Sequence, residues 1–310
     1  MKKIEAYAPA GISSFFAICD RDEKGNIIRD PLCIGAIGGG FKVLPPIKTI
    51  VEVEESSSTE IEIYINGSKE KAETSRRVVE KILSRVEGSY RIKVRHEIPL
   101  PVGAGFGTSG AGALSLAVAL TKALGLNLTI LEAAQIAHIA EVEAKTGLGT
   151  VGGLLSPTAC VITRKPGAPG IGIVDGIPLD ESISIVAVYF GPILTKHVLA
   201  DPSVREKVNR IGWSTLQAIL RDPSLENFLE KSMEFARITG FITPEVKRVI
   251  RALMNEKIIG YAQNMLGNAV HIVIESDYYY DLLQNLRKKL GGATIIKLEP
   301  TTLTVRVAIL

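Results

Sequence analysis

The sequence has few cysteines, and this scarcity excludes two common kinds of small protein. Three of the 310 residues are cysteine, and Cys19, Cys33 and Cys160 are far apart in the chain. Structural zinc sites and disulfide frameworks need closer or paired spacings, so we expect reduced thiols in a cytoplasmic protein. The amino-terminal residues also lack the apolar run of a signal peptide, which agrees with that location.

The sequence also lacks a strong charge and a long apolar run. Its formal net charge is +3 at pH 7, and a basic excess this small does not predict nucleic-acid binding. The most apolar predicted helix, Ala111–Leu126, is interrupted by Thr121 and Lys122 and is shorter than the roughly 20 residues that span a bilayer. We therefore expect a small-molecule substrate, with no nucleic acid and no membrane as partner. The oligomeric state stays open, a homodimer included.

What the sequence does contain is a glycine-rich loop within Pro99–Gly112. Prolines end the alternating run Tyr90–Ile98, glycines follow at every second position, and a Thr-Ser pair opens a run of small helix formers. This order of strand, loop and helix directs backbone N–H groups toward one point, where the positive end of the helix favours an anion such as phosphate. The hydroxyls of Thr108 and Ser109 lie where a helix needs a cap and where a metal-bound phosphate is within reach.

Two familiar phosphate-binding motifs do not fit this loop. No Gly-Lys-Ser/Thr follows the glycines, which excludes a P-loop. Prolines separate the strand from the glycines, and no acidic residue ends a second strand about 20 positions later, so the dinucleotide fingerprint is a poor match. A plain strand-to-helix turn remains the alternative explanation of the glycines.

Both halves of the chain are predicted to mix strands and helices. In the first half, predicted strands precede the helices, which indicates an α+β fold. After a boundary near Leu179–Ser182, the order strand, helices, two strands, helix, two strands predicts an antiparallel, ferredoxin-like sheet with helices on one face. The strands predicted for the first half are Lys2–Ala8, Phe15–Asp20, Cys33–Ile37, Ile47–Glu54, Ile61–Ile65, Tyr90–Ile98, Ala159–Arg164 and Ile171–Val174.

The helix after the core helix carries an ionisable stripe. Thr129 and Glu132 form a capping box at its start, and His138, Glu141 and Lys145 then fall on one side of it. A solvated edge with a Glu141–Lys145 ion pair is one interpretation. If the stripe lies beside a phosphate loop, a second interpretation is that its carboxylate binds magnesium. One carboxylate and one loop hydroxyl are enough protein ligands for a Mg²⁺ ion that also binds phosphate.

The segment Pro101–Ala111 resembles the central motif of the GHMP kinases, which is usually Pro-x-x-x-Gly-Leu-Gly-Ser-Ser-Ala. The resemblance implies that this loop wraps the triphosphate of ATP and that Ser109 and Glu141 are the catalytic ligands of Mg²⁺, with Glu143 as the less suitable carboxylate. It also implies the two-domain GHMP kinase fold, with a ribosomal-protein-S5-domain-2-like domain over residues 1–180 and a ferredoxin-like domain over residues 181–310. The nucleotide-binding residues would be Gly103, Ala104, Gly105, Phe106, Gly107, Thr108, Ser109 and Gly110.

A second resemblance covers essentially the whole chain. The segment from His138 to Gly149 and the later Met265-Leu266-Gly267-Asn268 are similar to the archaeal pantoate kinases within this superfamily. The resemblance implies that His138, Arg164 and Thr195 bind a small hydroxy acid, with Arg164 holding its carboxylate in a fork. A buried structural histidine, a surface arginine and a turn threonine are the alternatives.

Three departures from that family pattern fall at presumed site positions. Thr150 replaces an Asp that would act as base or orienter, Ala10-Gly11 replaces Gly-His, and Ala36-Ile37 replaces a Ser-Arg pair at the substrate. Loss of a base is tolerable, because phosphoryl transfer depends mostly on positioning and charge and a base adds only about 10²–10⁴-fold. We expect an ATP-dependent pantoate kinase of coenzyme A biosynthesis. A kinase for another small hydroxylated acid and a non-catalytic nucleotide-binding paralogue are the alternatives.

Overall fold

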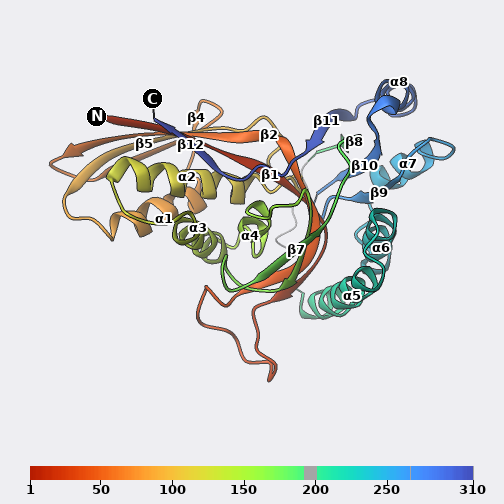
Figure 1. Cartoon of the computed structure of the whole chain (residues 1–310), viewed down its shortest axis with the longest axis horizontal. Helices are drawn as coiled ribbons and strands as arrows, with labels where there is room; N and C mark the ends of the chain where they lie inside the picture. The colour runs from red at the N-terminus through yellow and green to blue at the C-terminus, as the bar shows by residue number, and fades with distance from the viewer. Residues whose placement is uncertain (192–200, 266, 310) are drawn as a thin grey trace.

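The structure is a computed structural model that describes residues 1–191, 201–265 and 267–309. Within these residues, strands and helices form a mixed α+β fold (Figure 1). The strands are β1 (Lys2–Cys19), β2 (Gly35–Ser56), β3 (Glu60–Ile65), β4 (Ser68–Lys69), β5 (Ser89–Glu97), β6 (Cys160–Lys165), β7 (Ile173–Ile177), β8 (Ile183–Tyr189), β9 (Gly260–Gln263), β10 (Ala269–Glu275), β11 (Thr294–Pro300) and β12 (Arg306–Ile309). The helices are α1 (Glu73–Leu83), α2 (Thr108–Leu124), α3 (Ile130–Ala144), α4 (Thr150–Leu154), α5 (Pro202–Arg221), α6 (Leu225–Thr239), α7 (Pro244–Ala252) and α8 (Tyr279–Lys289).

The first half is built on two long antiparallel strands, β1 with 18 residues and β2 with 22. The sequence predicts a break in each, at Pro9–Ser14 and at Gly38–Gly40, and both predictions are wrong. In β1 the chain stays extended through bulges near Ala8 and Ser13. In β2 the glycines are required by the close pairing, because a Cβ on Gly40 would collide with the carbonyl oxygen of Ile12. The result is one continuous curved ribbon on which the rest of the first half is assembled.

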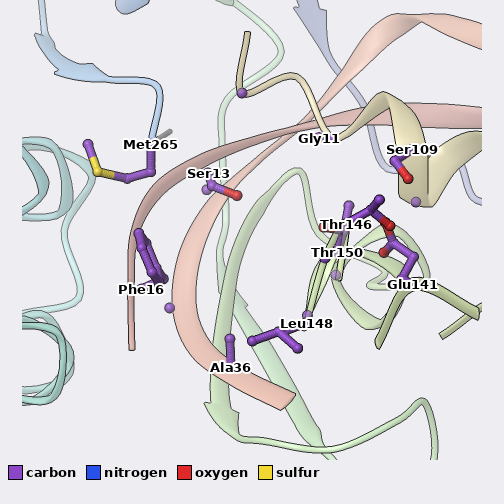
Figure 2. A pocket seen from close by; sticks show the side chains of 18 of the residues that line it. Gly11, Ser13, Phe16, Ala36, Ser109, Glu141, Thr146, Leu148, Thr150 and Met265 are labelled. Atoms are coloured by element: carbon purple, nitrogen blue, oxygen red, sulfur yellow. The ribbon is translucent and has the colours of Figure 1, made fainter. Parts of the chain in front are cut away.

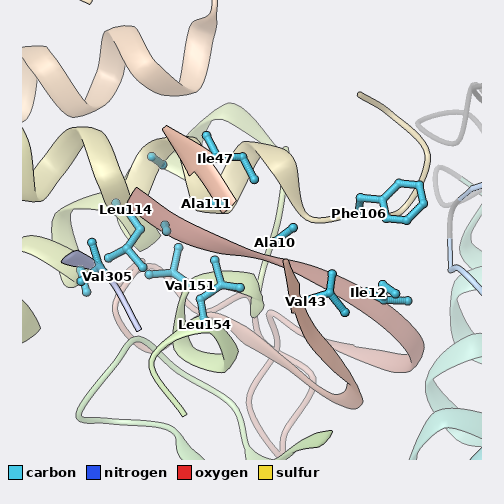
Figure 3. Packing of buried hydrophobic residues seen from close by; sticks show 14 of the residues in the cluster. Ala10, Ile12, Val43, Ile47, Phe106, Ala111, Leu114, Val151, Leu154 and Val305 are labelled. Atoms are coloured by element: carbon cyan, nitrogen blue, oxygen red, sulfur yellow. The ribbon is translucent and has the colours of Figure 1, made fainter. Parts of the chain in front are cut away.

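Helix α2 is the buried centre of the first half, as its apolar sequence predicts. It packs on β1, β2 and α3, and its buried side chains lie on all sides of it. Figure 3 shows Leu114 of α2 beside Val151 and Leu154 of α4 and Val305, all members of one core. Helix α4 is not predicted from the sequence, because five residues are too few to show a helical period.

The second half continues the sheet in the order β11, β8, β10, β9. Its elements follow the predicted order of a strand, helices, two strands, a helix and two strands. In β8, Val186 and Val188 face a smaller core with α7 and α8, while Ile185 and Ala187 join the larger core of the first half. Both faces of this sheet are therefore buried, which explains the apolar run 185–188 in β8.

The end of the chain returns to its beginning. Strand β12 pairs with β1, with Ile4 opposite Ile309, so the two termini lie side by side in Figure 1. Strand β11 pairs with β2, with Pro300 opposite Val43. The division into two domains at residue 180 stays a prediction. No helix in the described ranges is both long enough and apolar enough for a membrane crossing.

Candidate active site

A cavity of about 1020 Å³ lies between the glycine loop, the long strands β1 and β2, and the turn that follows α3. Figure 2 shows its two walls. Ser109, Glu141, Thr146 and Thr150 lie on one side, and Phe16 and Met265 lie on the other. Of the eight loop residues predicted to bind nucleotide, all except Ala104 line this cavity. We call the side with Ser109 and Glu141 the phosphate wall and the side with Phe16 the acceptor wall.

The glycine loop has the backbone conformation that its sequence predicts. Gly103, Gly105 and Gly107 have φ angles of 76°, 78° and 57°, which side chains other than glycine rarely adopt. The N-cap of α2 is Gly107, without a side-chain cap, so the expectation that Thr108 or Ser109 caps the helix is wrong. Because residues 107–110 line the cavity, the positive end of α2 lies at its surface, where an anion is favoured.

Two contacts between backbone groups connect this loop and the opposite wall to β1. The N–H of Gly11 donates to the carbonyl oxygen of Phe106 at 3.1 Å, and the Phe106 ring is buried in the core. The N–H of Met265 donates to the carbonyl oxygen of Ser13 at 2.7 Å. The phosphate wall and the turn after β9 are thus both fixed to the bulged centre of β1.

Glu141 is a buried acid on the phosphate wall. It is only 2% exposed, and its carboxylate lies between two glycines. A Cβ on Gly147 would lie 2.7 Å from either carboxylate oxygen, and one on Gly110 would lie 2.8 Å from Oε2. Burial raises the pKa of Glu141 to about 7, while hydrogen bonds from the Ser109 and Thr146 hydroxyls act in the opposite direction. The chain therefore holds a carboxylate with little solvent next to the first turn of α2.

Hydroxyl groups from three elements gather beside Glu141. Thr74 in α1 is 2.8 Å from the Thr146 hydroxyl, and Ser109 donates to Thr74 at 3.4 Å. Thr150, at the start of α4, directs its methyl group toward the glycine loop, 3.0 Å from where a Cβ on Gly107 would lie. The sequence offers no signal for Thr74, because it precedes the loop by more than twenty residues and belongs to no motif.

The solvated-edge interpretation of α3 is wrong, because Glu141 is buried and Lys145 leaves the helix. Lys145 ends α3 in the left-handed conformation, with a φ of 55°. Glu143, the less suitable carboxylate in the sequence, forms ion pairs with Lys81 at 2.7 Å and Arg77 at 3.5 Å. It does not line the cavity.

The residues present fit a magnesium ion that binds phosphate as well as protein. Among the described residues there is no group of three or more His, Cys, Asp or Glu side chains that would hold a metal alone. Mg²⁺ usually takes one or two protein ligands and completes its shell with phosphate oxygens and water. The hydroxyl of Ser109 and the buried carboxylate of Glu141, which both line the cavity beside the positive end of α2, match that requirement.

Of the predicted substrate residues that the structure describes, Ala36 lines the cavity, whereas His138 and Arg164 do not. His138 is buried, and its Nε2 lies 2.9 Å from the carbonyl oxygen of Ile34 and 3.2 Å from that of Pro31. Burial lowers the pKa of His138, so the neutral ring donates to these carbonyls. In this position it holds the connection between β1 and β2, which reaches the cavity at Ile34 and Ala36.

Arg164 lies on β6 and does not line the cavity, whereas its neighbour Thr163 does. Arg164 is the extra residue of a bulge between Thr163 and Lys165 in the pairing of β6 with β7, and its side chain lies on the outer face. There its Nη1 contacts Asp175 at 3.0 Å, and both side chains are half exposed. Thr195 lies outside the described residues. The substrate roles of these residues stay predictions.

Several residues of the acceptor wall escape prediction from the sequence. Ser13, Phe16 and Met265 line the cavity, and so does an ion pair between Asp20 at the end of β1 and Arg205 in α5. Met265 belongs to a segment that resembles the pantoate kinases, but the resemblance assigned it no role at the site. Asp20 and Arg205 belong to no such segment, and α5 begins more than 180 residues after β1 ends. Tertiary structure alone brings them to the cavity.

Comparison with known proteins gives a family match in the first half. Residues 73–162 match the family of GHMP kinases, N-terminal domain. This range begins in α1, contains the glycine loop, α2 and α3, and ends in β6. It therefore includes the whole phosphate wall described above.

Similar proteins cover nearly the whole chain. It is 32% identical over 288 residues to the pantoate kinase of Methanocaldococcus jannaschii, which covers 91% of this chain and 96% of that protein. It is also 32% identical to the pantoate kinase of Thermococcus kodakarensis, over 88% of each chain. Among solved structures, a phosphotransferase related to the coenzyme A biosynthesis pathway superimposes with a TM-score of 0.87 at 28% identity, covering 99% of this chain and 98% of that one.

Proposed function

We propose that this chain, which belongs to the GHMP kinase family, is a pantoate kinase that transfers the γ-phosphoryl group of ATP to the terminal hydroxyl of pantoate. The product would be 4-phosphopantoate, on the route to coenzyme A. The observation that carries the proposal is the phosphate wall, where a buried carboxylate and a hydroxyl lie beside the positive end of a helix. We place this activity in the cytoplasm.

The phosphate wall supplies the charge stabilisation that phosphoryl transfer needs. The backbone of the glycine loop and the first turn of α2 would hold the phosphates of ATP, with N–H groups fixed before the reaction begins. Ser109 and Glu141 would hold Mg²⁺, which neutralises phosphate charge when bound. Thr74 accepts a hydrogen bond from Ser109 and so limits the orientations of that hydroxyl.

The acceptor hydroxyl would lie near Thr150, where the related kinases usually have an Asp. A threonine hydroxyl orients the acceptor by hydrogen bonding but does not take its proton at neutral pH. Because the transition state is loose, positioning and charge provide most of the rate, and loss of the base costs about 10²–10⁴-fold at most. We therefore propose a kinase that works without a carboxylate base at this position.

The shape of the cavity supports a compact, branched acceptor. Gly11, Phe16, Ala36 and Leu148 line it with apolar or small groups. Pantoate carries two methyl groups on the carbon next to its terminal CH₂OH group. Burial of such groups against an apolar wall removes them from water and stabilises the complex.

Coupled measurement of ATP consumption by the purified protein tests this proposal. Pantoate, mevalonate, homoserine and glycerate would be compared with Mg²⁺ present. We expect the highest kcat/KM with pantoate, and 4-phosphopantoate identified as product by mass spectrometry. If kcat/KM is higher with another hydroxy acid, that acid replaces pantoate as the proposed substrate. ATP binding by calorimetry with no turnover of any acceptor would instead favour a non-catalytic paralogue.

A further inference from the structure

A carboxylate substrate needs a cation in this cavity. Its negative charge must approach a triphosphate, and the repulsion has to be offset at the end of the acceptor away from the phosphates. Among the described residues that line the cavity, Lys and Arg occur at Lys42, Lys145 and Arg205. Arg164 is not one of them, and its guanidinium contacts Asp175 on the outer face of β6.

Two of these three cations are placed for other tasks. The ammonium of Lys42 donates to the carbonyl oxygens of Leu303 at 2.9 Å and Thr302 at 3.3 Å, so it ties β2 to the segment before β12. Burial lowers the pKa of Lys42 to about 8. Lys145 ends the helix of Glu141 and precedes Thr146, which lies on the phosphate wall in Figure 2. Within residues 1–191, 201–265 and 267–309, Arg205 is the cation of the cavity that remains for the acceptor.

Arg205 lies in the first turn of α5, which packs on the end of β1. The side chain of Asn209, one turn further along α5, accepts a hydrogen bond from the N–H of Ile18 at 2.8 Å. This contact fixes α5 beside Phe16, and Figure 2 shows Phe16 across the cavity from Ser109. Arg205 therefore belongs to the acceptor wall.

We propose that Arg205, held by Asp20, anchors the carboxylate of the acceptor. Asp20 forms an ion pair with one terminal nitrogen of the guanidinium, and both side chains remain about 30% exposed. A guanidinium has five N–H donors in a planar fork, so donors remain for a second carboxylate while the first holds the group in place. This assignment rests on the proposed function, because it specifies the acceptor site of that kinase.

The acidic groups near Arg205 bear on its binding role. Asp201, the N-cap of α5, lies one helical turn before Arg205, and its carboxylate accepts a hydrogen bond from the N–H of Ser203 at 2.8 Å, so the positive end of this helix is already balanced. The helix dipole therefore adds no charge for a bound anion, and the carboxylate of the acceptor would bind through the guanidinium donors that Asp20 does not use.

The assignment predicts discrimination between hydroxy acids and neutral alcohols. Arg205→Ala is expected to raise KM for pantoate about 30-fold or more, which corresponds to about 2 kcal/mol for loss of a charged partner. The KM for ATP should stay within about twofold, because the phosphate wall is unchanged. Arg205→Lys should recover part of the loss, since an ammonium keeps the charge but not the fork. Arg210→Ala, an exposed arginine on the same helix, is the matched control.

The carboxamide of pantoate separates binding from a structural role. It keeps the shape and the hydroxyls of the acid but lacks the charge, so Arg205→Ala should change its kcat/KM by less than about threefold. An equal loss with acid and amide would mean that Arg205 only supports the fold, and the proposal would be wrong. The proposal also fails if Arg205→Ala leaves KM for the acid unchanged, or if Arg164→Ala produces the rise instead.

Failure of the proposed function gives a different result. If the wild-type protein prefers another hydroxy acid, pantoate kinase is wrong, and the same variants measured with that acid and its amide decide the role of Arg205. If the wild-type protein prefers an acceptor without a carboxylate, the anchor proposal is overturned. Thermal unfolding of each variant, followed by circular dichroism, confirms that the fold is retained.

Discussion

The two walls of the cavity are constructed in different ways. The phosphate wall comes from one stretch of chain, in which a glycine loop, α2 and α3 follow each other and the buried Glu141 lies between glycines. The acceptor wall comes from β1, β2, α5 and the turn after β9, segments that are far apart in sequence. A triphosphate is the same for every kinase of this kind, so a local motif suffices for it. The acceptor differs, and its wall depends on side chains that only the fold brings together.

The largest effect is expected on the phosphate wall. Glu141→Gln keeps the shape and removes the charge, so turnover should fall by about 100-fold or more. The free energy of unfolding at pH 7.5 should not decrease, because burial opposes the charge of Glu141. Steady-state kinetics and urea unfolding measure the two quantities.

Glu143→Gln is the matched control for that variant, since Glu143 lies two residues further along α3 and pairs with Lys81 outside the cavity. Its kcat should stay within about threefold of the wild type, as is usual for an exposed ion pair. A large loss with Glu143→Gln and a small one with Glu141→Gln would reverse the assignment.

A smaller effect is expected for the backbone of the same wall. Gly105→Ala places a side chain at a φ of 78°, with its Cβ 2.9 Å from the carbonyl oxygen of Met265. The loop should shift, and the affinity for ATP should fall by about 10-fold or more, given a backbone strain of about 1–3 kcal/mol. Gly105→Val should lose binding altogether. Calorimetry with ATP measures both.

Gly125→Ala separates strain from binding, because Gly125 has a similar φ of 72°, ends α2 away from the cavity and has open space around its Cβ position. It should lose stability but bind ATP as the wild type does. Unchanged ATP affinity in a folded Gly105→Val variant would show that the loop is only a turn.

A still smaller effect is expected on the acceptor wall from Asp20→Asn. Its partner Arg205 would keep its charge but lose the group that orients it, and a partly exposed ion pair is worth at most about 1 kcal/mol. We expect KM for the acceptor to rise by about fivefold or less, with KM for ATP unchanged. If KM rose for ATP and not for the acceptor, Asp20 and Arg205 would act on the phosphates, and the two walls would not have separate roles.

The smallest effect on activity is expected from two buried histidines, one behind each wall. His96 bonds Thr49 at 2.8 Å and lies beside α2, while His271 bonds Ser14 at 3.0 Å and Asn264. Burial lowers the pKa of His96 to about 4 and that of His271 to about 3. Both rings are therefore neutral at pH 7, and activity near that pH should not follow their titration.

Their effect appears in stability at acidic pH. Between pH 6.5 and 4 the unfolded chain binds protons that the folded chain does not, so the free energy of unfolding rises with pH and falls on acidification. From pH 6.5 to pH 5 each histidine should lower the free energy of unfolding by about 1.6 kcal/mol. His96→Gln and His271→Gln should each reduce the change of the free energy of unfolding with pH, measured by urea unfolding. A slope equal to that of the wild type in both variants would contradict the assignment.

Prediction from the sequence succeeded where neighbouring residues decide the structure. The loop Gly103–Gly110, the capping box at Thr129 and the buried helix α2 follow from local rules of glycine conformation, capping and hydrophobic pattern. The breaks predicted at Pro9–Ser14 and Gly38–Gly40 were wrong for the same reason. Local rules assign proline and glycine to turns, whereas here pairing between β1 and β2 keeps the chain extended.

The sequence by itself predicted the α+β class and a glycine loop before a buried helix, because loop conformation, capping and hydrophobic pattern are local. Through the resemblance to the GHMP kinases it also predicted that Ser109 and Glu141 face one site, and both line the cavity. Only the tertiary structure decided what faces the acceptor. The pairing of β6 with β7 places Arg164 beside Asp175 and outside the cavity, burial commits His138 to the carbonyl oxygens of Pro31 and Ile34, and the packing of α5 on β1 brings Arg205 to the cavity. The positions of His138 and Arg205 depend on contacts between residues more than a hundred positions apart, and local sequence carries no information about them.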